Sequence, residues 1–93
     1  QQAEDYKIQL NSRKLQLLNE VSKYEEALQY YEMEGQSLSE EILKTANISF
    51  KNGEIDFFQY IQSLENAYEI ELQYLENLNN YNQAVIALNY LIL

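Results

Sequence analysis

The chain has 93 residues with fifteen acidic and six basic side chains, and its formal net charge at pH 7 is −9. This length limits it to one domain, and the acidic balance argues against a nucleic-acid partner, because phosphate contacts need Lys and Arg. The sequence has no Pro, no Cys, no His and only two Gly. Since a turn-rich all-β fold needs frequent punctuation, the composition predicts an all-α protein.

Residues 3–34 are predicted to form one helix with a coiled-coil stripe. Apolar and aromatic side chains recur there every seven residues, at positions 10, 17, 24 and 31. Val21 and Leu28 each lie four residues after one of them. This spacing places them on one face of a helix that packs against another helix. Lys14 interrupts the stripe near its beginning. The stripe consists of Leu10, Leu17, Val21, Tyr24, Leu28 and Tyr31.

A possible break follows near Gly35. Glycine suits the left-handed conformation that ends a helix, and Ser37 with Glu40 three residues later has the spacing of a capping box. The alternative is one helix that continues through Gly35, at a cost of roughly 1 kcal/mol relative to Ala. The sequence leaves both possibilities open. In either case residues 38–51 are predicted to form an amphipathic helix.

A second break is predicted at Asn52 and Gly53, which we interpret as a structural hinge. Gly53 fits the left-handed end of a helix. Glu54 and Asp56 follow it, and the helix dipole favours acidic residues in the first turn of a helix. The sequence therefore predicts that a new helix begins near Glu54.

Residues 54–92 form the clearest helical pattern, because apolar side chains recur every seven residues in three adjacent columns. A helix with so wide a stripe is expected to contact at least two neighbours. Its length of about 58 Å, at 1.5 Å per residue, predicts long antiparallel coiled-coil packing in a hairpin or bundle. The columns are Tyr60, Ala67, Tyr74, Tyr81 and Leu88; Phe57, Leu64, Leu78, Val85 and Ile92; and Ile61, Tyr68 and Leu75.

No catalytic, cofactor-binding or metal site is predicted, and we do not expect an enzyme. Catalysis needs a nucleophile with a base, convergent carboxylates or a metal ion, and the usual base and thiol are missing because the chain has no His and no Cys. Glu65, Glu69 and Glu76 could hold a hard cation only loosely, since tight oxygen sites need more ligands and a loop that wraps the ion.

A longer pattern lies in the second half of the chain. It begins with Ala-x-x-x-Phe-x-x-Gly-Glu-Ile, continues with Leu-x-x-Ala, and ends with Tyr-Asn-x-Ala-Val-x-x-Leu. The residues that form it are Ala46, Phe50, Gly53, Glu54, Ile55, Leu64, Ala67, Tyr81, Asn82, Ala84, Val85 and Leu88. This pattern resembles the outer membrane efflux (TolC-like) family, and the Gly-Glu-Ile form is most similar to its heavy-metal cation efflux branch. Phe50 stands where Tyr is usual in that family, and Ser37 where this branch often has Pro.

The resemblance implies a segment of a homotrimeric α-helical tunnel in the periplasm of a Gram-negative bacterium, beneath an outer-membrane barrel. Its partners would be the other two copies, a periplasmic adaptor (membrane fusion) protein and an inner-membrane cation pump of the RND type, to which such modules are sometimes fused. The helices of the family descend to a tip that meets the adaptor and then return. On this basis we expect the tip near residues 15–24, and helices that continue in roughly one direction on either side of Gly53.

The alternative function is a free-standing coiled-coil interaction or scaffold module without a transport role. Under the first hypothesis the chain is a fragment of a larger efflux protein and acts as a passive conduit. Because its apolar columns would then lack their neighbours, the isolated chain is expected to form helical oligomers as its concentration rises.

Overall fold

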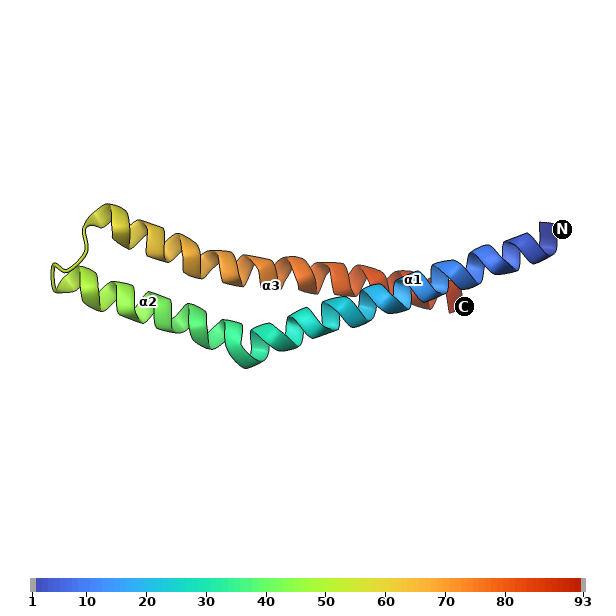
Figure 1. The fold of residues 1–93 in the computed structure, drawn as a ribbon, viewed down its shortest axis with the longest axis horizontal. Coiled ribbons are helices and arrows are strands. Elements are labelled where there is room, and N and C mark those ends of the chain that lie inside the picture. Colours follow the sequence, from blue (N-terminus) through green and yellow to red (C-terminus); the bar gives the residue numbers. More distant parts are fainter. Residues whose placement is uncertain (1, 93) are drawn as a thin grey trace.

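The computed structural model describes residues 2–92, which fold into a helical hairpin (Figure 1). Its elements are α1 (Gln2–Tyr30), the π-helical turn η1 (Tyr31–Gly35), α2 (Gln36–Lys51) and α3 (Phe57–Ile92). The first three join end to end into one arm, and α3 forms the other arm. The predicted all-helical hairpin is confirmed. Its extents are 72 × 22 × 15 Å.

The two arms are antiparallel, so α2 lies beside the first part of α3 and α1 beside its last part (Figure 1). None of the helices within residues 2–92 combines the length and the apolar character that a membrane span requires. Near the open end of the hairpin, α1 extends past the end of α3 (Figure 1). The hairpin is therefore a long two-helix structure with a narrow seam of contact and most side chains at its surface.

The core is this seam, and small residues dominate it. Ala67 is completely buried, and Ala46 and Ala84 are each 4% exposed. Short side chains at such positions let two helix backbones approach closely. Leu17 is the one large apolar side chain among the buried residues of the described part of the chain, and Ser39 is fully buried beside Ala67.

The first predicted column of α3 faces the other arm. Its five residues are all buried or half-buried. The third column differs, because Tyr68 is 56% and Leu75 is 57% exposed. The expectation that α3 has two neighbours is not met within this chain, since the hairpin supplies only one. Phe57 is also exposed, and the side chain of Ile92 lies outside the described residues.

The region around Gly35 is neither a helix end nor a regular α-helix. Gly35 has φ −63° and ψ −42°, so of the two possibilities left open by the sequence the left-handed helix end is not adopted. The N–H of Gln36 donates to the carbonyl of Tyr31, five residues earlier, which is a π-helical hydrogen bond. Ser37 lies exposed within α2 rather than at the start of a helix. The arm bends visibly at this turn (Figure 1), as helices do at π-bulges.

The chain reverses between α2 and α3, at residues 52–56, which we call the tip turn (Figure 1). Two expectations drawn from the family resemblance are therefore wrong for this chain. Residues 15–24 lie inside α1 and make no turn. The helices on either side of Gly53 run in opposite directions, because the tip turn folds α3 back along the first arm.

Candidate functional site

The tip turn begins with a glycine-based helix end. Gly53 has φ +72°, a conformation that glycine adopts without steric cost. Its N–H donates to the carbonyl of Phe50 at 3.1 Å, and the N–H of Glu54 donates to the carbonyl of Ser49 at 2.9 Å. This pair of bonds is a Schellman motif, which satisfies carbonyls that the end of a helix leaves free. Asn52 is the residue between the last helical position and Gly53.

The turn ends with a capping box that starts α3. The backbone N–H of Gln59 donates to Asp56 Oδ1 at 2.8 Å, and the backbone N–H of Asp56 donates to Gln59 Oε1 at 3.0 Å. These reciprocal bonds satisfy two donors at the start of the helix. Asp56 is thus the cap of α3 rather than a residue of its first turn. The spacing Asp-x-x-Gln before an apolar run was the sequence signal for it.

Aromatic side chains gather on the hairpin beside the tip turn. The ring of Phe50 stacks on that of Tyr60, with centroids 4.6 Å apart, and lies 6.3 Å from that of Phe57. The Tyr60 hydroxyl donates to Asn47 Oδ1 at 2.6 Å. These contacts join α2 to α3 directly above the turn. Phe58 is 76% exposed, so the tip presents a large apolar side chain at its surface.

A second cluster joins the arms at the bend. The rings of Tyr31 and Tyr74 stack with centroids 4.2 Å apart. The Ser39 hydroxyl lies 3.2 Å from the carbonyl oxygen of Ala67 and 3.3 Å from Glu71 Oε1, so its single proton is shared between two acceptors. Partial burial is the main cause that raises the pKa of Tyr31, and the negative charge of Glu71 adds to it.

The outer face of α3 carries a second heptad pattern that the first arm does not cover. Its residues are spaced by four and three along the helix, all six are exposed, and we call them the outer seam. Four acidic side chains and no basic one accompany it on α3. Beside Tyr68, Leu72 and Leu75 a shallow groove of about 440 Å³ is bordered by three of those acids. The outer seam consists of Tyr68, Leu72, Leu75, Asn79, Asn82 and Ile86.

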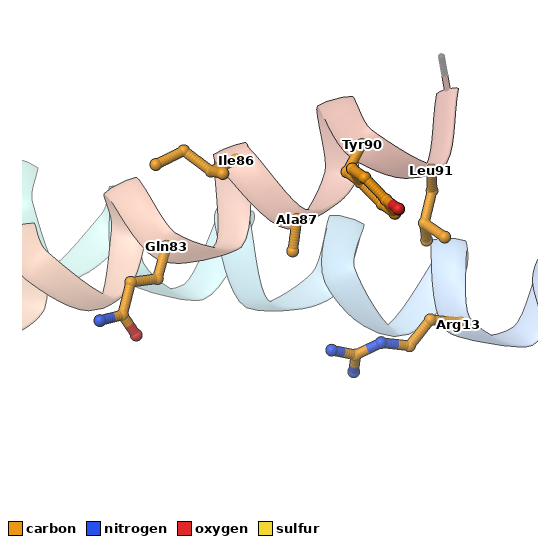
Figure 2. Close-up of a pocket in the computed structure, with 6 residues that line it drawn as sticks. All are labelled: Arg13, Gln83, Ile86, Ala87, Tyr90 and Leu91. Atoms are coloured by element: carbon orange, nitrogen blue, oxygen red, sulfur yellow. The ribbon is translucent and has the colours of Figure 1, made fainter.

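The open end of the hairpin has a similar shallow groove of about 440 Å³ between α1 and α3 (Figure 2). Arg13 comes from α1 and the other five lining residues come from α3. Ile86 belongs also to the outer seam, and Tyr90 is 82% exposed. The groove is lined by Arg13, Gln83, Ile86, Ala87, Tyr90 and Leu91.

The four predicted hinge and break residues lie in two separate places. Asn52 and Gly53 belong to the tip turn, whereas Gly35 and Ser37 lie at or next to the bend. The burial of Ser39 could not be predicted from the sequence, because a serine in an amphipathic helix usually lies at the surface. Within residues 2–92 no three acidic side chains are grouped so that they could hold a metal ion.

Comparison with protein-family models, with curated proteins and with solved structures finds no significant match to this chain.

Proposed function

We propose that this chain is a helical hairpin from the periplasmic tunnel of a TolC-like outer-membrane efflux component, and that it acts as a passive conduit in the efflux of heavy-metal cations. Three copies would form the tunnel wall, and a periplasmic adaptor and an RND-type inner-membrane pump would complete the pathway. The proposal starts from the family-like pattern between Ala46 and Leu88.

The observation that carries the proposal is the exposed outer seam of α3. A heptad seam that is half apolar indicates a helix that packs against a further helix. In this hairpin Leu72 is 55% and Ile86 is 67% exposed, although both occupy such positions. A tunnel wall supplies the missing neighbour, because each helix there lies between two others.

The proposal needs a tip at another place than the resemblance implies. Helices in the family descend to a tip and return, and this hairpin reverses at residues 52–56. We therefore assign the tip to this turn instead of residues 15–24. Phe58 is the exposed apolar side chain with which the tip would contact an adaptor.

The charge of α3 fits a passage for cations. Glu65, Glu69, Glu71 and Glu76 are the charged residues of the helix, and no basic residue accompanies them. A surface lined by one sign of charge raises the local concentration of counter-ions. Acidic side chains beside the outer seam would favour metal cations over anions in the tunnel.

The first test is the self-association of the chain, measured by sedimentation over a range of concentrations. We expect the average mass to rise with concentration, and Leu72→Gln to weaken this association by shortening the apolar part of the outer seam. Met33→Gln is the matched control, because Met33 is 80% exposed and lies away from the outer seam. A compact monomer at every concentration would contradict the wall assignment.

The second test concerns transport. In the full reading frame that contains this segment, we expect amphipathic strands and a second helical repeat outside these residues. Expressed in an efflux-deficient Gram-negative host, that protein should raise metal tolerance, and Phe58→Asp at the tip should remove the gain. A reading frame without these elements, with no effect on metal tolerance, would favour the scaffold alternative.

A further inference from the structure

The seam of the first arm contains one residue more than a regular coiled coil allows. Coiled-coil seams alternate steps of three and four residues. Around the bend the steps are instead four and four, from Tyr31 to Gly35 and from Gly35 to Ser39. All three residues are buried or half-buried against α3. The seam therefore passes through the bend without interruption, although its spacing changes there.

A regular α-helix could not carry this spacing on one face. Residues of an α-helix are rotated by about 100° from one to the next, so the eight residues from Tyr31 to Ser39 would turn about 80° beyond two full turns. Seven residues would fall only about 20° short, which supercoiling absorbs. The π-helical hydrogen bond from Gln36 to Tyr31 takes up the eighth residue, because it closes a turn over five residues instead of four.

Side chains at the bend fit this turn. A Cβ atom on Gly35 would lie 2.9 Å from Cδ2 of Tyr31, so the tyrosine ring occupies the space that any other residue would need. Tyr31 in turn stacks on Tyr74 of α3. Ser39, the next seam residue, is fixed to Ala67 and Glu71. Glycine is thus required at position 35 for its small size and not for a left-handed conformation.

We propose that η1 is a one-residue insertion that bends the first arm while the seam continues in register on both sides of it. The bend and the register are then separate properties of the hairpin. Removing one residue from η1 straightens the arm and leaves the same side chains facing α3. This inference is independent of the efflux function, because it concerns only the contacts within one chain.

Deletion of one residue at two positions tests the proposal. Met33 is 80% exposed and lies inside η1, so its deletion should return the turn to a regular α-helix with both parts of the seam in place. Ser22 is exposed within α1, and its deletion rotates the residues before or after it by about 100°. Leu17 or Tyr24 then leaves the seam.

We expect the melting temperature of the Met33 deletion, measured by circular dichroism, to stay within about 5 °C of the wild-type value. The Ser22 deletion should lower it by on the order of 10 °C. Equal losses in the two variants would overturn the proposal, because η1 would then hold no surplus residue. If both deletions left the melting temperature almost unchanged, the proposal would be overturned as well, because the seam would then have no fixed register.

A distance measurement tests the bend itself. The chain has no Cys, so Ser12→Cys and Lys51→Cys provide two unique sites for spin labels, one on each side of η1. The mean distance between the labels should increase in the Met33 deletion, although a straight helix loses about 1.5 Å with each residue. A distance that decreases by that amount would show that η1 does not cause the bend.

Discussion

The two halves of the hairpin are held together by different kinds of contact. In the tip half, α2 and the facing part of α3 share the hydroxyl contacts of Ser39 and Tyr60 and the stack of Phe50 on Tyr60. In the terminal half, α1 meets α3 through seam residues such as Leu17 and Ala84. Polar contacts have strict geometry, whereas apolar packing tolerates small shifts. The tip half thus fixes how the arms align, and the terminal half extends that alignment.

The largest expected effect comes from adding bulk at a fully buried position between the arms. Ala67→Leu adds bulk at a position with no exposed surface, next to the buried Ser39, and should destabilise the hairpin by about 2 kcal/mol. Ala84→Leu is the matched change in the terminal half, and we expect it to cost about half as much because its surroundings can shift. Urea unfolding of both variants measures the difference. Equal losses would mean that the two halves are equally rigid.

The next effect concerns the tip turn. Gly53→Ala places a side chain at φ +72° and should destabilise the hairpin by about 1–2 kcal/mol. Gly53→Asn should lose less, because asparagine tolerates the left-handed conformation better. Both can be compared by thermal unfolding. A loss of stability in Gly53→Ala would come from the backbone conformation and not from a steric clash, because nothing lies within 4 Å of the added Cβ atom. An unchanged melting temperature in Gly53→Ala would therefore contradict the left-handed turn.

A smaller effect is expected at the buried hydroxyl. Ser39→Ala removes its contacts with Ala67 and Glu71 and should lower the free energy of unfolding by about 1 kcal/mol. Ser37→Ala is the control, because this serine is exposed two residues earlier and should change stability by less than about 0.5 kcal/mol. If the two variants were equally stable, the polar contact would not distinguish the tip half.

The smallest effect is a pH dependence at the bend. The pKa of Tyr31 is raised above its ordinary value of 10.0, so the unfolded chain loses this proton at a lower pH than the folded one. The stabilisation is complete below about pH 10 and is lost as the pH rises through the folded pKa. Tyr31→Phe keeps the stacked ring and should make the melting temperature fall less steeply above that pH. Identical slopes in the two proteins would refute this contribution.

The sequence was sufficient to predict which faces of the helices meet. Tyr60, Ala67, Tyr74, Tyr81 and Leu88 recur every seven residues, and all of them face the first arm. Periodicity reports the face of a helix but not the identity of its neighbour. For this reason Tyr68 and Leu75, in an equally regular column, could not be recognised as exposed in the hairpin.

The direction of the chain and the nature of the bend were harder to predict. A glycine after a helix indicates an end, but the angle at which the next helix leaves depends on the arms that pack above the turn. The sequence left open whether the helix ends at Gly35, because glycine was weighed there for its φ, whereas its missing Cβ is what the Tyr31 ring requires. The two successive four-residue steps at Gly35 were the available signal.

The tip turn also bears on the order in which the hairpin folds. Its Schellman motif and capping box join residues at most five positions apart, so they form without closing a long loop. The ring contact of Phe50 with Phe57 is the next most local, and its stack on Tyr60 follows. Each further pair of seam residues lies only a few positions farther out. We therefore expect the contacts between the arms to form first near Gly53 and then progressively toward the termini. Mutations near the tip should slow folding, and mutations near Leu17 should mainly accelerate unfolding.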